Sequence, residues 1–94
     1  MNKRQLVAAA ACRTSLTQRQ VRQALDALLG TIAEALADGE SVALSDFGRF
    51  KAQHYPARQL RQFGGKGRFT VQGHSVPVFR SSEALRRRVK EKNL

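Results

Sequence analysis

The chain begins with two stretches whose apolar residues recur at helical spacing. A favourable N-cap residue precedes the first stretch and predicts a short helix that starts at Lys3 and ends near Arg13. The pair Thr17 and Gln20 has the spacing of a capping box, and a broad apolar stripe follows it. The sequence therefore predicts a second and longer helix over residues 18–38.

The period changes beyond Gly39, which is placed to end the second helix as a left-handed cap. Val42 and Leu44 alternate with small or polar residues, and this two-residue period is typical of a strand. The two-residue period resumes after the turn at Phe47–Gly48, and it appears again in a stretch before the predicted C-terminal helix. We therefore expect a three-stranded antiparallel sheet.

Two strands of this sheet are predicted to continue outward as a β-ribbon arm. Pro56 lacks a backbone donor, which marks the place where the arm leaves the regular sheet. Gly73 predicts a bulge or a bend in the returning strand. The tip is expected near residues 55–70, and Ser81 or Ser82 is expected to cap a short C-terminal helix.

The fold class is α+β. We expect one domain over residues 1–94, because compact domains span about 50 to 200 residues. Its parts are a helical base over residues 1–38, the sheet and arm over 39–80, and a C-terminal helix over 81–94. So short a chain builds a small core, and its one cysteine cannot form an internal disulfide, so association with another subunit is the expected reinforcement. Cys12 is expected to be a small buried apolar residue.

The net charge of +10 is unevenly distributed along the chain. Lys/Arg and Asp/Glu cancel at five each in residues 1–48, so all of the excess lies in residues 49–94. Such an asymmetry indicates binding to nucleic acid or to another anionic surface. The predicted arm carries four of the candidate phosphate contacts, which are Arg58, Arg61, Lys66 and Arg68.

Several other functions are not favoured. The sequence has no nucleophile and base in a recognisable pairing, so we expect no enzyme, no small-molecule substrate and no cofactor. His54 and His74 are too few to form a metal site. The apolar run over residues 6–12 is too short to span a membrane, and we expect a soluble cytoplasmic protein without membrane contact.

The sequence resembles the bacterial HU and integration host factor family of DNA-bending proteins over nearly its whole length. The resemblance rests on a set of motifs at matching positions, namely Met1-Asn2-Lys3, Phe47-Gly48-Arg49-Phe50, Arg58, Arg61, Val76-Pro77-Val78-Phe79 and Ala84-Leu85. It implies an intertwined dimer with a helical base, a saddle of strands and two arms that reach around DNA in the minor groove. A shared dimer core would bury Phe47, Phe50 and Phe79, which are too many large aromatic residues for one small chain.

The arm tip departs from the family pattern. The tip over residues 61–66 places Phe63 where the family usually has a proline that wedges between base pairs. Phenylalanine is also an apolar wedge that can kink DNA from the minor groove. Gly64 and Gly65 could instead leave a tip that does not insert.

These observations predict an architectural protein of the bacterial nucleoid that binds double-stranded DNA with little sequence preference and bends or wraps it. Lys3, which matches a family position, is expected to hold a flanking phosphate together with Lys51 and Arg80. We expect a homodimer. Two alternatives stay open: an RNA-binding module, and one subunit of a heterodimer that pairs with a paralogue and prefers particular DNA sites.

Overall fold

The computed structural model describes residues 1–61 and 67–93, and for Leu60, Arg61, Arg68 and Phe69 it describes the backbone alone. The chain divides into two compact units, Met1–Glu34 and Ala35–Leu94. The single domain expected over residues 1–94 stays a prediction.

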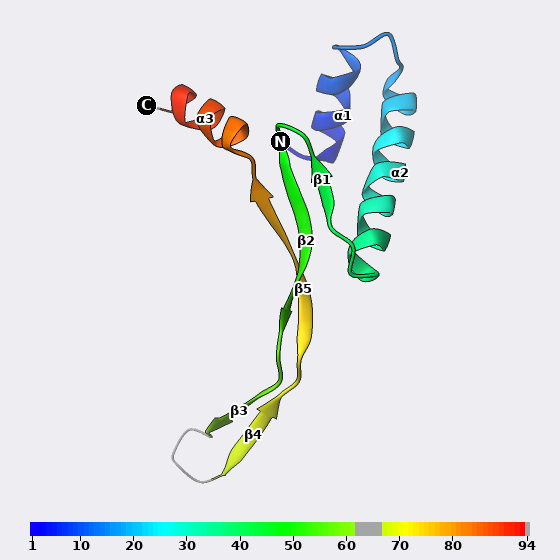
Figure 1. The fold of residues 1–94 in the computed structure, drawn as a ribbon. Helices are drawn as coiled ribbons and strands as arrows, with labels where there is room; N and C mark the ends of the chain where they lie inside the picture. The colour runs from blue at the N-terminus through cyan, green and yellow to red at the C-terminus, as the bar shows by residue number, and fades with distance from the viewer. Residues whose placement is uncertain (62–66, 94) are drawn as a thin grey trace. The chain divides into compact units, whose positions relative to one another are not determined.

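Two helices, α1 (Lys3–Ala11) and α2 (Gln18–Ala37), occupy most of the first unit, and the last turn of α2 extends into the second (Figure 1). Capping boxes start both helices. The Thr17 and Gln20 side chains each accept a hydrogen bond from the other residue's backbone N–H, at 3.1 and 2.9 Å. Both predicted helices are confirmed, and α1 ends two residues before the predicted end at Arg13.

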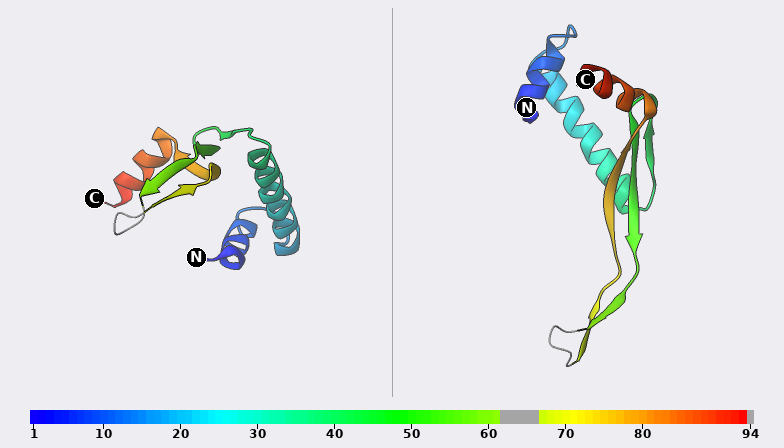
Figure 2. Two further views of the ribbon diagram at one scale, coloured as in Figure 1. Left: turned by 90° about the horizontal axis from the view of Figure 1, so that it is seen from below. Right: turned by 90° about the vertical axis from the view of Figure 1, so that its left-hand side faces the viewer.

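Five strands and a third helix form the rest of the second unit. The elements are β1 (Val42–Leu44), β2 (Gly48–Tyr55), β3 (Arg58–Arg61), β4 (Arg68–Val71), β5 (His74–Ser81) and α3 (Glu83–Lys92). One antiparallel sheet has the strand order β1-β2-β5, and β3 and β4 form a separate two-stranded ribbon. The views in Figures 1 and 2 show β2 and β5 running side by side, with the β3–β4 ribbon at one end and α3 at the other. The predicted sheet and arm are confirmed.

The arm is interrupted without losing its register. Tyr55 pairs with His74, and the next pair is Arg58 with Val71, so two residues on each strand lie between these pairs. Gly73 contributes to a bend here rather than to a bulge, because neither strand has an extra residue. A Cβ atom on Gly73 would lie 3.0 Å from the backbone nitrogen of Ala57, so the two strands approach each other closely at the bend.

The turn between β1 and β2 is closed by a hydrogen bond of 3.0 Å from the Phe47 N–H to the Leu44 carbonyl. Asp46 has a φ of 62°, which is the positive value that the third position of a type II turn requires. The Phe47 carbonyl accepts a hydrogen bond of 2.8 Å from the Ser82 N–H. Ser82 also caps α3, so the start of this helix is attached to the β1–β2 turn.

Three aromatic rings lie together on the sheet. The Phe79 ring centroid is 5.6 Å from that of Phe47 and 4.8 Å from that of Phe50. We call these three residues the aromatic cluster. Phe47 is nevertheless 47% exposed and Phe79 41% exposed.

Few apolar side chains are enclosed by a single chain. Val7 is the only buried hydrophobic side chain among those whose burial the structure describes. Cys12, expected to be buried, is exposed; that prediction was wrong because the residue lies at the C-terminal cap of α1, where the helix ends. The protein therefore leaves large apolar surfaces for which one chain provides no cover.

Candidate nucleic-acid interface

Three basic side chains share one face of the sheet. Arg49 lies directly opposite Arg80 on the antiparallel strands β2 and β5, and opposite residues point to the same face. Lys51 is two residues beyond Arg49 and therefore lies on that face too. We call Arg49, Lys51 and Arg80 the basic face. The neighbouring cross-strand pair, Phe50 with Phe79, lies on the opposite face, where the aromatic cluster is.

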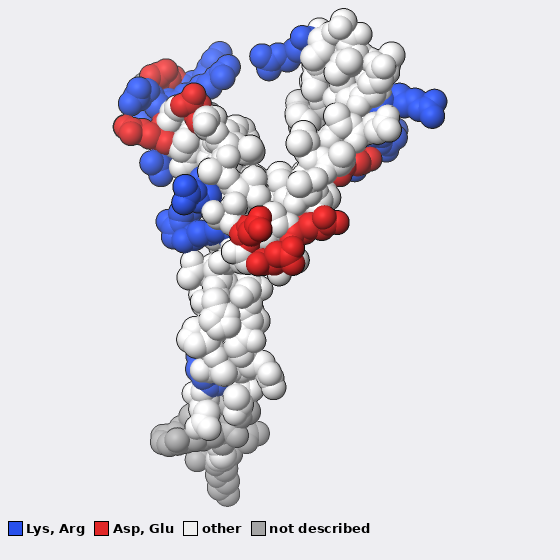
Figure 3. All heavy atoms as spheres, turned by 45° about the vertical axis from the view of Figure 1, so that its right-hand side comes forward, with Lys and Arg blue, Asp and Glu red and all other residues white. Residues whose placement is uncertain are grey.

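The basic face has no acidic neighbour along its own strands. Residues 47–82 include seven Lys/Arg and no Asp or Glu. Arg49 and Arg80 are exposed, and both line a shallow hollow that also includes Ser81 and Ser82. Among the residues whose side chains the structure describes, Figure 3 shows Lys and Arg gathered toward the end of the ribbon that carries α3. Two exposed guanidinium groups on directly opposite residues favour an anion that can contact both of them.

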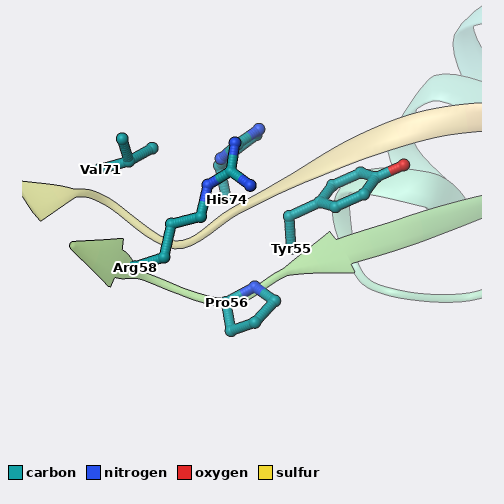
Figure 4. Close-up of a pocket in the computed structure, with 5 residues that line it drawn as sticks. All are labelled: Tyr55, Pro56, Arg58, Val71 and His74. Atoms are coloured by element: carbon teal, nitrogen blue, oxygen red, sulfur yellow. The ribbon is translucent and has the colours of Figure 1, made fainter. Parts of the chain in front are cut away.

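A second hollow lies at the bend of the arm. We call it the arm hollow, and its lining residues come from β2, β3, β4, β5 and the bend (Figure 4): Tyr55, Pro56, Arg58, Val71 and His74. The Tyr55 and His74 rings are stacked at a centroid distance of 5.7 Å and an interplanar angle of 29°. The walls are mainly apolar, and Arg58 adds an exposed positive charge.

The arm bend changes which residues share a face. In an uninterrupted strand Arg58 would point away from Tyr55, because the two residues are three positions apart and side chains alternate. Both residues nevertheless line the arm hollow. The bend therefore turns the outer ribbon relative to the sheet and brings Arg58 to the side of Tyr55 and His74.

The structure brings some of the predicted phosphate-binding residues together and not others. Lys51 and Arg80 lie on the basic face, and Arg58 lies in the arm hollow. Lys3 is in the helical unit, where its ammonium group forms an ion pair with Asp26, and both side chains are about half exposed, at 50% and 51%. Lys3 therefore already has an anionic partner.

The remaining predicted DNA-binding residues belong to the arm tip. The strand register pairs Arg61 with Arg68, and their side chains are not described. Phe63 and Lys66 lie outside the described residues. The roles of these four residues stay predictions.

Arg49 and His74 line these hollows but were not among the predicted DNA-binding residues. Arg49 could have been identified from the sequence, since it precedes Lys51 by two residues in a predicted strand and so shares its face. His74 had no such signal, because its proximity to Arg58 depends on the bend and on the pairing of distant strands.

The third helix carries basic residues together with an acidic residue in its first turn. Ser82 accepts a hydrogen bond of 3.1 Å from the Leu85 N–H, and Glu83 follows in the first turn, where the helix dipole favours an acid. Arg87 donates to Glu83 at 3.3 Å, and both side chains are exposed. Such an exposed pair contributes little to stability, but it partly neutralises this side of α3.

Within the described parts of the chain, no helix is long and apolar enough to cross a membrane. The same residues bring together no group of three His, Cys, Asp or Glu side chains that could hold a metal ion.

The chain is similar to known proteins over almost its whole length. The family described as bacterial DNA-binding protein matches residues 1–90. The DNA-binding protein HU-alpha of Vibrio cholerae is 38% identical over 90 residues, which cover 96% of this chain and 100% of that protein. The DNA-binding protein HU of Streptococcus thermophilus is 37% identical over 89 residues, covering 95% and 98%. A cocrystal structure of Anabaena HU with DNA matches with a TM-score of 0.82 at 35% identity, covering 95% of this chain and 97% of that one.

Proposed function

Since the chain belongs to the family of bacterial DNA-binding proteins, we propose that it is an architectural protein that binds double-stranded DNA with little sequence preference and bends or wraps it. The family resemblance inferred from the sequence is confirmed by these matches. Members of this family are architectural proteins, and the protein is not an enzyme. We place it in the cytoplasm, on the bacterial nucleoid.

The observation that carries this proposal is the basic face. Arg49 and Arg80 are opposite each other and exposed, and no acid occurs in residues 47–82 to neutralise them. Phosphate groups of DNA supply the anion that such a face favours. Their binding releases condensed counterions, which supplies most of the affinity of a protein that does not read base sequence.

The arm extends the interface beyond the sheet. Arg58 follows the bend and is placed to continue the line of phosphate contacts outward, and Arg61, Lys66 and Arg68 are proposed to continue it at the tip. Phe63 is proposed to insert between base pairs from the minor groove. Unstacking a base step costs about a few kcal/mol, which the additional arm contacts offset.

The exposed aromatic cluster supports a homodimer. Phe79 lies on the face opposite the basic face, and the Phe47 ring lies beside it from the β1–β2 turn. Each of the two residues leaves more than two fifths of its surface uncovered. Burial of apolar area contributes about 25 cal/mol per Å², so a second copy that covers these rings would stabilise the fold. An intertwined dimer would also carry two arms, which can hold one duplex from two sides.

The salt dependence of DNA binding tests this function. Titration of a fluorescent duplex of about 20 base pairs should show affinity falling by about three to five orders of magnitude between 50 and 200 mM salt if six to ten phosphates are bound. An affinity that barely changes with salt contradicts the proposal.

Two further experiments address the alternative functions. A structured RNA that displaces the duplex at equal salt would favour an RNA-binding module. A purified chain that is monomeric and does not bind DNA until a paralogue is added would favour the heterodimer. The DNA-binding names of the relatives support neither alternative over the homodimeric DNA-binding protein.

A further inference from the structure

The two histidines of the arm lie on adjacent rungs but on opposite faces. His54 pairs with Ser75 and Tyr55 pairs with His74 in the same ladder. Side-chain alternation places His74 on the face of Arg49, Lys51 and Arg80, and His54 on the face of Phe50. The two histidines therefore lie at neighbouring positions along the arm, but their side chains are on opposite faces of it.

His74 is held in a defined orientation beside a cationic group. Its ring stacks on Tyr55, and its Nδ1 lies 3.2 Å from the Gln72 carbonyl oxygen. Because a carbonyl oxygen only accepts, this hydrogen bond assigns the Nδ1 proton and leaves Nε2 as the atom that can gain a proton. Arg58 lines the same hollow.

The charged and titratable groups around His74 favour an anion there. Tyr55 faces it from β2 and Arg58 from β3, and β5 itself contributes no further charge until Arg80. No acid occurs in residues 47–82 that could neutralise a protonated imidazole. A phosphate between Arg58 and His74 would therefore be the group that stabilises the charged ring.

We propose that His74 contacts a DNA phosphate together with Arg58, and that it does so as the protonated imidazolium, so that DNA binding takes up a proton. Histidine is the side chain whose charge ordinarily changes between pH 5 and 8. The affinity of the arm for DNA therefore rises as the pH falls through that range. The inference rests on the proposed function, and it adds a binding residue and a form of regulation to the same surface.

Duplex titrations at about pH 5.5 and pH 8.0, at equal ionic strength, test the inference. The wild-type protein is expected to bind about three- to tenfold more tightly at the lower pH. His74→Gln should remove most of this difference, and His54→Gln, the matched control on the opposite face, should retain it. His74→Lys carries a permanent charge and should bind tightly at both pH values.

The salt slope gives a second readout. At the lower pH the slope of log K against log salt should be less steep in His74→Gln than in wild type, by about 0.9 for each phosphate that the variant no longer binds. Thermal unfolding of each variant checks that the fold is kept, and both histidines are exposed, so little change in stability is expected.

The outcomes separate the inference from the function on which it rests. Absence of duplex binding at both pH values contradicts the proposed function and the inference together. Salt-dependent binding whose pH dependence persists in His74→Gln, or is absent from the wild type, overturns the inference alone. Loss of the pH dependence in His54→Gln would assign the proton to the other face and overturn it as well.

Discussion

Arg49 and Arg80 lie directly opposite each other on the antiparallel strands β2 and β5, with their side chains on one face. Like charges in this relationship destabilise a sheet, and opposite charges or neutral residues do not. In the protein without bound DNA the two arginines repel each other, and an anion bound between them would relieve this repulsion. The relationship therefore connects the stability of the sheet to the binding of phosphate.

Replacing one member of this pair should have opposite effects on stability and binding. Arg49→Gln is expected to raise the free energy of unfolding by about 0.2–0.5 kcal/mol, because it removes the repulsion, and to weaken duplex binding. The salt slope should fall by about 0.9 for each phosphate released from the interface. Urea unfolding and duplex titration measure the two effects. Arg88→Gln on α3 removes the same charge, and equal weakening there would assign the effect to net charge alone.

Gly48 is expected to be intolerant of any side chain. A Cβ atom at this position would lie 2.5 Å from the Phe79 ring and 2.6 Å from the Arg80 carbonyl oxygen. Gly48→Ala should lower the free energy of unfolding by about 1–3 kcal/mol through overpacking. Gly30→Ala is the control, since a Cβ there meets no atom within 4 Å, and it should stabilise α2 by about 0.5–1 kcal/mol. Two variants of equal stability would contradict the close packing of β2 against Phe79.

Self-association should depend on the aromatic cluster. Light scattering at micromolar concentration is expected to give the mass of a dimer, and the unfolding temperature should rise with protein concentration. Phe47→Ala should lower the free energy of dimer unfolding by about 3 kcal/mol, because the shared core would then lack one ring.

Tyr55 provides a matched control for this experiment. It is 46% exposed against 47% for Phe47, but it lies on the arm outside the aromatic cluster. Tyr55→Ala should change dimer stability by less than about 1 kcal/mol. A stable folded monomer, or equal effects of the two substitutions, would be evidence against the dimer.

Bending of DNA should depend on Phe63 more than binding does. Phe63→Ala is expected to reduce the bend, measured by fluorescence energy transfer between the ends of a duplex, while the phosphate contacts keep most of the affinity. Phe63→Leu keeps an apolar wedge and should retain much of the bend. If alanine and wild type bend DNA equally, Phe63 does not insert.

Much of the fold follows from local patterns in the sequence. The apolar period and the capping residues place α1 and α2, since both depend on residues within a few positions of each other. Gly39 ends α2 with a φ of 81°, as its sequence context predicts. The uneven charge distribution alone indicates an anionic partner for residues 49–94. Family resemblance then supplies the duplex as that partner.

Tertiary structure decides how these parts are combined. The sequence contains Arg49, Lys51 and Arg80 but does not state the register of β2 and β5, so only the pairing shows that Arg49 and Arg80 are opposite. Gly73 is compatible with a bulge or a bend, and the equal number of residues on both strands decides for the bend. Strand pairing joins residues that are far apart in the chain, so no local pattern can specify the neighbours of His74. The sequence determines that the arm is basic, and the tertiary structure decides which face carries the charge.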